Sequence, residues 1–111
     1  MTEIPEHLRK RAEEARAKAA AAKAGVMALT RCAAVEAADA GVRVNCVAPS
    51  IAMHPHLAKT SSDELLAGLV ANEAFGRAAE PWEVANVMVF LASDLSSYMT
   101  GEVVSVSSRH P

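Results

Sequence analysis

Small and apolar residues recur at alternating steps of four and three along the first third of the chain, which is the spacing of one face of a helix. These residues are Leu8, Ala12, Ala15, Ala19, Ala22, Val26, Leu29 and Ala33. Pro5 suits a first helical turn, Gly41 suits a helix end, and strong helix formers fill the span between them. The pattern predicts one long helix, or two abutting helices, from residue 5 to about residue 40.

The repeating face of this helix, which we call the alanine seam, consists mostly of alanine. Alanine buries little apolar area per residue, so the seam cannot hold a partner strongly by itself, although it permits a close approach of helices. Two interpretations remain open. The helix is solvated with one face on its own domain, or it packs against a second chain.

Beyond Gly41 the pattern predicts two strands separated by helices. The stretch VRVNCVAPS is rich in valine, alternates, and predicts a strand ending at Pro49, while EVVSVS predicts a second strand near the C-terminus. Residues 50–60 are expected to form a loop around Pro55. A short helix is expected to start at Ser61, with Glu64 at capping-box spacing.

A further helix is expected to open at Pro81. Its expected core face is Val84, Val87, Met88 and Leu91. Two strands joined through helices in one sheet imply parallel pairing, and two parallel strands do not make a stable sheet by themselves. The sequence therefore predicts an α/β fold whose sheet lacks its neighbouring strands.

Composition narrows the classes of function. The chain has 111 residues, 51% of them apolar, and a formal net charge of −2, which argues against nucleic acid or an anionic membrane as the main partner. No apolar run is long enough to span a membrane, and no secretory signal is expected. Cys32 and Cys46 lack metal-ligand spacing and are interpreted as buried thiols in a reducing cytoplasm. His54 and His56 flank a proline and are interpreted as part of a loop, so no metal site is expected.

The blocks AAAKAGVMALTR, GVRVNCVAPS, FGRAAEPWEVANVMVFLASDLSSYMTGE and VVSV resemble, in order, the C-terminal part of classical short-chain dehydrogenases/reductases. The resemblance covers residues 20–111, and residues 1–19 are interpreted as an N-terminal helical extension unlike the family. It implies a fragment of a Rossmann-like, doubly wound parallel sheet of about two strands. The chain looks most like actinobacterial ketoreductases of acyl-CoA or acyl-carrier-protein substrates, particularly those that degrade steroid ring fragments.

The resemblance implies NAD(P)-dependent interconversion of a ketone and an alcohol. The family uses a tyrosine as acid or base and a lysine four residues later, which lowers the pKa of the tyrosine and binds the nicotinamide ribose. Lys23 matches this lysine, but the tyrosine position is Ala19, which has no proton to give. The family's catalytic serine has no counterpart in the preceding stretch EHLRKRA.

The cofactor elements are also incomplete. The family's glycine-rich phosphate loop has no match, because the five glycines of the chain are scattered. Pro49, Ser50 and Ile51 match the loop that holds the nicotinamide carboxamide, with Ser50 in place of the family glycine, and a family threonine falls at His54. We therefore expect NAD or NADP to serve the family but not to bind this chain alone.

Three hypotheses follow from these residues. The chain is an oxidoreductase fragment that is truncated and inactive alone. Alternatively, it is a non-catalytic assembly or regulatory module, a homo-oligomer or a hetero-oligomer with a full-length reductase, since the family packs this helix and its last strand between subunits. In the third, it is an enzyme completed by another polypeptide that supplies the tyrosine. A cytoplasmic location without nucleic-acid or membrane partners is expected in each case.

Overall fold

The computed structural model describes residues 4–60 and 62–109 of the chain. The helices are α1 (Glu6–Ala37), α2 (Pro55–Thr60), α3 (Asp63–Val70) and α4 (Pro81–Ala92), and the strands are β1 (Cys46–Pro49) and β2 (Val103–Val106). Single 3-10 turns follow α1 at Ala38–Ala40 and α4 at Asp94–Ser96. This order of elements matches the predicted α/β fold.

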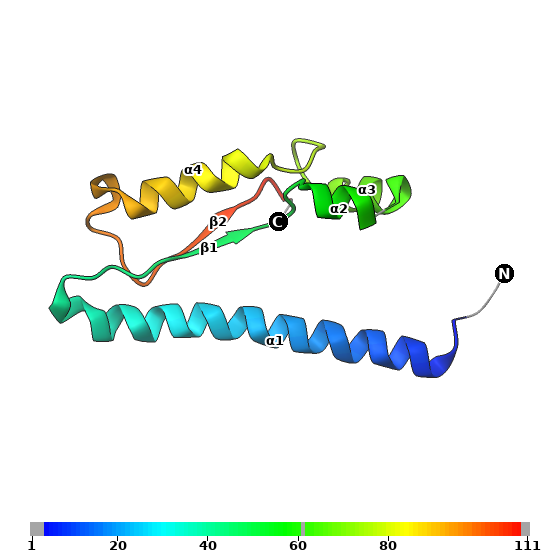
Figure 1. Ribbon diagram of the computed structural model, residues 1–111, viewed down its shortest axis with the longest axis horizontal. Helices are drawn as coiled ribbons and strands as arrows, with labels where there is room; N and C mark the ends of the chain where they lie inside the picture. Colours follow the sequence, from blue (N-terminus) through cyan, green and yellow to red (C-terminus); the bar gives the residue numbers. More distant parts are fainter. Residues whose placement is uncertain (1–3, 61, 110–111) are drawn as a thin grey trace.

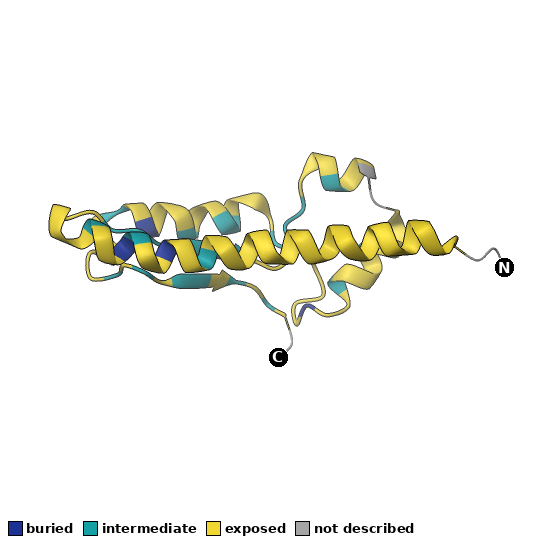
Figure 2. Cartoon of the chain, turned by 90° about the horizontal axis from the view of Figure 1, so that it is seen from below, coloured by how far each residue is buried: buried dark blue, intermediate teal, exposed yellow. Residues whose placement is uncertain are grey.

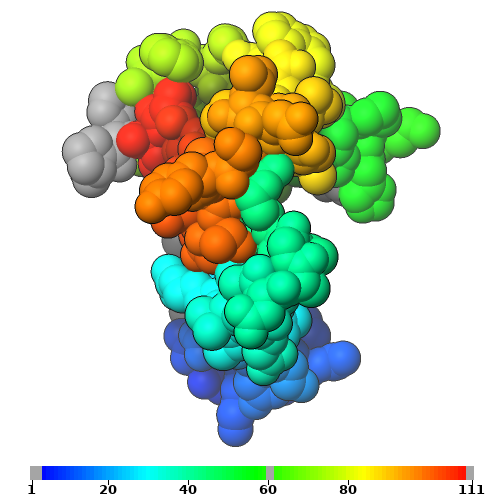
Figure 3. Space-filling model, turned by 90° about the vertical axis from the view of Figure 1, so that its left-hand side faces the viewer, coloured from blue at the N-terminus to red at the C-terminus, as the bar shows by residue number. Residues whose placement is uncertain are grey.

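The two strands form a parallel sheet in which Cys46 pairs with Val103 and Pro49 with Val106. Helix α4 lies along one side of this sheet and α1 along the other, so the fold has three layers (Figure 1). Seen along the sheet, α1 forms a layer of its own below the rest of the chain (Figure 3). The carboxyl ends of both strands lie at the same edge of the sheet because the strands are parallel.

The core is small for a chain of this length. Among the described residues, the buried apolar side chains are Ala34, Ala78 and Leu91. The radius of gyration is 17.6 Å, whereas a compact domain of this size has a value of about 13 Å. Large apolar side chains such as Trp82 and Val89 remain exposed. Burial within the chain therefore covers only part of its apolar surface.

The face of α1 that packs on the sheet is not the predicted seam. Thr30 and Ala34 are buried, and Met27 and Ala37 are half-buried, which places the packed face one residue further along the heptad. The seam residues Val26 and Leu29 are 53% and 67% exposed. Every residue from 4 to 26 is exposed, so the N-terminal part of α1 is yellow in Figure 2 and its buried residues lie near the other end.

The first strand is shorter than predicted, since it begins at Cys46 rather than just after Gly41. The preceding residues are extended but bond to a loop instead of to a strand. The Arg43 guanidinium donates to Ser96 Oγ and to the carbonyls of Ser93 and Met99, at 2.9, 3.0 and 3.3 Å. Asn45 Nδ2 also donates to the Met99 carbonyl, at 2.9 Å. These bonds fasten the entry of β1 to the segment that follows α4.

The predicted loop at residues 50–60 contains the one-and-a-half-turn helix α2. The backbone N–H of Leu57 donates to His54 Nδ1 at 3.1 Å, so this histidine caps the helix that Pro55 opens. The next helix begins after Ser62, whose hydroxyl accepts from the N–H of Leu65 at 3.2 Å. The cap is thus one residue later than predicted, and Ser61 itself lies outside the described residues.

Three burial predictions were wrong. Cys32 is exposed because it lies on the opposite side of α1 from the buried Thr30 and Ala34. Cys46, on β1, is only half-buried. On α4, Leu91 is buried and Val84 and Val87 are half-buried, as expected for the core face. Met88 is instead 57% exposed, because the two-stranded sheet is too narrow to cover it.

The start of α4 is held by a capping box and an ion pair. The Glu80 backbone N–H donates to Glu83 Oε1 at 2.9 Å, and Arg77 Nη1 and Nη2 reach the two carboxylate oxygens of Glu83 at 2.6 and 3.2 Å. The hydrogen bond from Arg77, followed by that from the Glu80 backbone, lowers the pKa of Glu83 from 4.5 to about 2. The same pairing raises the pKa of Arg77.

Gly101 has a φ of +73°, and a Cβ there would lie 3.3 Å from the Cβ of Ala34, which is buried. Gly76 has a similar φ of +67° but open space around it. We expect Gly101→Ala to destabilise the fold more than Gly76→Ala, since both incur a backbone cost of about 1 kcal/mol but only the former presses on α1. Urea unfolding followed by circular dichroism measures the difference. Equal midpoints would show that α1 yields freely.

Because the pKa of Glu83 is depressed in the folded chain, the carboxylate stabilises the fold above about pH 4.5. That stabilisation is lost as pH falls from 4.5 toward 2. We expect Glu83→Gln to lower the urea midpoint at pH 7 and to flatten its decline in this acidic range. Glu102→Gln, at an exposed carboxylate with no ion pair among the described residues, is the matched control. A decline unchanged by Glu83→Gln would contradict the assignment.

Candidate functional site

The predicted catalytic pair lies on α1. Lys23 is exposed there, and Ala19 precedes it by four residues, so both positions share one helix face. Among the described residues, the Lys23 ammonium makes no ion pair. The helix therefore presents Lys23 to solvent, with the methyl group of Ala19 one turn before it.

The predicted cofactor loop leaves the sheet at the end of β1. Pro49 is the last residue of the strand, and the backbone N–H of Ser50 donates to the Val106 carbonyl at 3.2 Å. The Ile51 carbonyl accepts from the N–H of Ala79 at 2.9 Å, and the N–H of Met53 donates to the Ala79 carbonyl at 2.8 Å. The loop is thus fixed between the end of β2 and the segment before α4.

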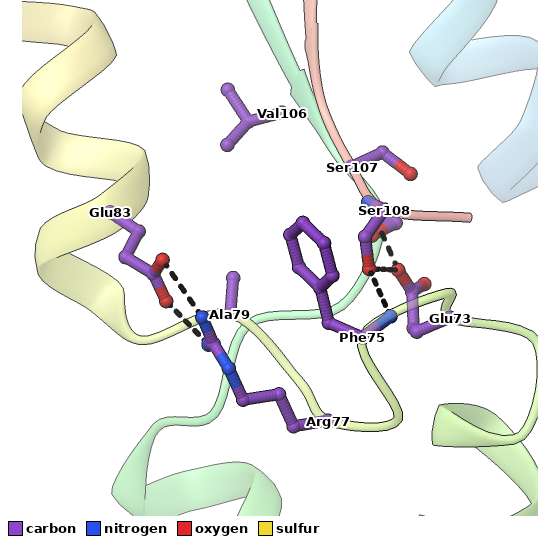
Figure 4. Close-up of a pocket in the computed structure, with 9 residues that line it drawn as sticks. Glu73, Phe75, Arg77, Ala79, Glu83, Val106, Ser107 and Ser108 are labelled. Atoms are coloured by element: carbon purple, nitrogen blue, oxygen red, sulfur yellow. Dashed lines mark hydrogen bonds and ion pairs between the residues drawn. The ribbon is translucent and has the colours of Figure 1, made fainter.

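A pocket of about 180 Å³ opens beside this loop, at the carboxyl edge of the sheet. Figure 4 shows the residues that line it, with the ring of Phe75 between Val106 and the Arg77 side chain. The full lining is Ser50, Glu73, Phe75, Arg77, Ala79, Glu83, Val106, Ser107 and Ser108. Of the predicted site residues, Ser50 lines this pocket, whereas Lys23, Pro49 and Ile51 do not.

The polar groups of the pocket are mostly paired with each other. Glu73 is only 6% exposed, and its Oε2 accepts from the backbone N–H and the hydroxyl of Ser108, at 3.2 and 3.0 Å. Arg77 is engaged by Glu83, whose pKa it lowers. These pairs tie the chain after β2 to the segment between α3 and α4. They hold backbone in place, and the one hydroxyl that meets a carboxylate in these pairs, that of Ser108, serves this tie to Glu73.

Sequence reasoning missed the Arg77–Glu83 and Glu73–Ser108 pairs. For the first there was a usable signal, because Glu80, Pro81 and Glu83 have the spacing of a helix start with a capping acid at its third position. For Glu73 and Ser108 there was none, since these residues lie 35 positions apart and meet only in the folded chain.

Taken one at a time, two groups of the predicted cofactor site suit contact with one end of a nicotinamide cofactor. The backbone N–H of Ile51 makes no backbone hydrogen bond among the described residues, so it is available to a carboxamide, and the free ammonium of Lys23 suits ribose hydroxyls. The phosphate end is not accommodated, because the described part of the chain contains no glycine-rich turn before a helix. No hydride-transfer step can therefore be assigned to these residues alone.

The described part of the chain offers neither a metal site nor a membrane-spanning helix. Within residues 4–60 and 62–109, no group of three or more His, Cys, Asp and Glu side chains could hold a metal ion. None of the helices described there has both the length and the apolar character needed to cross a membrane.

Comparison with known proteins identifies the relatives of the chain. The family model described as enoyl-(acyl carrier protein) reductase matches residues 7–108. A hydroxy-methyl-oxo-hexahydro-indene-carboxyl-CoA reductase of Mycobacterium tuberculosis is 67% identical over 101 residues, covering 91% of this chain and 38% of the relative. A 3-oxoacyl-(acyl-carrier-protein) reductase of Chlamydia pneumoniae is 44% identical over 87 residues, covering 78% of this chain and 35% of that relative.

A solved structure extends the similarity to the fold. A short chain dehydrogenase from Mycobacterium smegmatis is 60% identical and superposes with a TM-score of 0.61, covering 83% of this chain and 31% of that protein. The chain thus spans less than two fifths of the length of these curated relatives. By the extent of the family match and the identity of its relatives, the chain belongs to the short-chain dehydrogenase/reductase family.

Proposed function

We propose that the chain forms the C-terminal part of an NAD(P)-dependent reductase of ketones carried on coenzyme A or an acyl carrier protein. The observation that carries the proposal is the 67% identity to a carboxyl-CoA reductase over 91% of the chain. Lys23 would bind the nicotinamide ribose, and Pro49, Ser50 and Ile51 would line the nicotinamide end. The chain by itself is proposed to be inactive, because Ala19 cannot donate a proton to a carbonyl.

The proposal also includes where in the cell the chain is located and at which residue its family-like part begins. Cys32 and Cys46 are both free thiols, which suits the reducing cytoplasm where we place the chain. The family match starts at residue 7 and so includes part of residues 1–19, which were interpreted as an extension. The division at residue 20 stays a prediction, and a chimera joined there tests it.

In this chimera, residues 20–111 replace the aligned segment of the Mycobacterium tuberculosis reductase, which keeps its own preceding residues. We expect the chimera to reduce the ketone of the relative's substrate with NADH or NADPH. Lys23→Ala in the chimera should lower kcat by about 100-fold or more, whereas Lys59→Ala, at an exposed lysine on α2, should not. The unfused 111-residue chain should show no turnover.

Steady-state oxidation of NADH and NADPH, monitored at the absorbance of the reduced nicotinamide, measures these rates. A folded chimera without activity, or one in which Lys23→Ala and Lys59→Ala behave alike, would contradict the assigned role of residues 20–111. Turnover by the 111-residue chain alone would contradict its proposed inactivity.

A second candidate function is assembly with a full-length reductase. Val47, Met88, Leu91 and Ala92 line an open groove of about 350 Å³ between β1 and α4, with Arg43 and Asn45 at one end. The edge of β1 that faces away from β2 pairs with no strand among the described residues. A sheet with an open edge and an apolar groove beside it favours the addition of a strand from a partner.

For this second candidate we expect the tagged chain to retain the full-length Mycobacterium smegmatis dehydrogenase on a column. Met88→Asp should abolish retention by placing a charge in the groove, whereas Lys59→Asp, on α2 and outside the groove, should leave it unchanged. Retention that survives Met88→Asp, or no retention at all, would count against assembly through this groove.

A further inference from the structure

Backbone hydrogen bonds on two sides hold the loop after β1, which contains Ser50 and Ile51. On one side the Ser50 N–H donates to the Val106 carbonyl at 3.2 Å, at the end of β2. On the other side the Ile51 carbonyl accepts from the N–H of Ala79 at 2.9 Å, in the segment before α4. The loop therefore depends on how firmly these two anchoring segments are held relative to each other.

Glu73 and Ser108 join the two anchoring segments (Figure 4). Oε2 of Glu73 accepts from the backbone N–H of Ser108 at 3.2 Å and from its hydroxyl at 3.0 Å. The Ser108 carbonyl in turn accepts from the N–H of Ala74 at 2.5 Å. Because Ser108 lies just beyond Val106 and Glu73 lies shortly before Ala79, these contacts complete a ring of three segments around the pocket.

The buried carboxylate makes this contact resist separation. Glu73 is only 6% exposed, and among the described residues no Lys or Arg forms an ion pair with it. A carboxylate buried without a cation is costly unless hydrogen bonds satisfy it, and bonds to a charged acceptor are stronger than neutral ones. Movement of Ser108 away from Glu73 would remove both of these donors, so the pair opposes any opening of the ring.

The other charged pair of the pocket has no such effect. Arg77 and Glu83 both belong to the segment before α4 and the start of that helix, so their ion pair joins no second segment. We propose that Glu73 is a positioning residue, which through Ser108 fixes the loop of Ser50 for the nicotinamide end of the cofactor. This inference rests on the proposed function, because it assigns Glu73 a part in the cofactor site of the completed reductase.

Amide hydrogen exchange in the 111-residue chain, followed residue by residue by NMR, tests the coupling without a cofactor. Glu73→Leu removes the acceptor at similar size and should speed exchange of the Ser50 and Ala79 amides about tenfold. Glu73→Gln keeps an acceptor and should restore most of the protection. The Cys46 amide, which donates to the Glu102 carbonyl at the other end of β1, should keep its rate in each variant.

Glu36→Leu is the matched control, because it makes the same replacement at an exposed carboxylate of α1. It should leave these exchange rates within about twofold. If Glu73→Leu also speeds exchange at Cys46, the whole sheet opens in that variant. Ser108→Ala, which removes only the hydroxyl donor, then decides the result. Unchanged exchange at Ser50 in both variants, or a rise at Cys46 equal to that at Ser50 in both, would overturn the proposal.

The chimera with the Mycobacterium tuberculosis reductase measures the effect on the cofactor. Glu73→Leu should raise the KM for NADH or NADPH about tenfold, and Glu73→Gln should not. A simple loss of folded enzyme would instead lower the apparent kcat at unchanged KM. An active chimera whose cofactor KM is unchanged by Glu73→Leu would rule out the positioning role and leave the proposed function intact. An inactive chimera would contradict the proposed function, and the exchange rates would still decide whether Glu73 holds the loop of Ser50.

Discussion

The parallel pairing of β1 with β2 is the interaction on which the rest of the structure depends. It joins residues 46–49 to residues 103–106, and every helix except α1 lies in the connection between them. Its register puts Ser50 and Ser107 at the same edge of the sheet. The loop after β1, the segment before α4 and the C-terminal segment meet there in a pocket. Two strands of four residues offer little area, so α1 and α4 each bury a narrow face on the sheet and leave the remainder exposed.

The structural predictions that were correct are those that local sequence decides, and those that failed depend on how the narrow sheet packs. The existence, type and order of the long helices and both strands followed from periodicity, helix propensity and the Pro and Gly signals, because these depend on neighbours in sequence. The face of α1 could not be chosen in this way. The stripe containing Val26 and Leu29 and the stripe containing Thr30 and Ala34 both fit a heptad, and the contact of Ala34 with the turn at Gly101 selects the second. Likewise, β1 begins late because Arg43 finds its partners in a loop 50 or more residues away.

In the candidate site, too, some residues could be located from sequence and others only from the fold. Lys23 and the alanine at position 19 could be located from sequence, since one helix sets their spacing and the family blocks fix their register. The polar groups that build the pocket could not, because Glu73 meets Ser108 only through the sheet register. Sequence therefore predicts which residues would touch a cofactor, whereas the contacts that hold the Ser50 loop in place required the fold. The pocket lies at the carboxyl edge of a sheet that the rest of a family member would extend, whereas Lys23 lies on the exposed part of α1 and does not line it.

The N-terminal part of α1 keeps its helix for a different reason from the rest of the chain. No tertiary contact buries residues 6–26, so alanine, arginine, lysine and glutamate must sustain the helix through their intrinsic propensity. A helix stabilised in this way keeps its shape without drawing on contacts with the sheet. Lys23, which was predicted to match the family lysine, lies on this self-sustained part of the helix. The position of the Lys23 ammonium group is therefore set by the helix alone, because the residue is exposed and no ion pair among the described residues engages it.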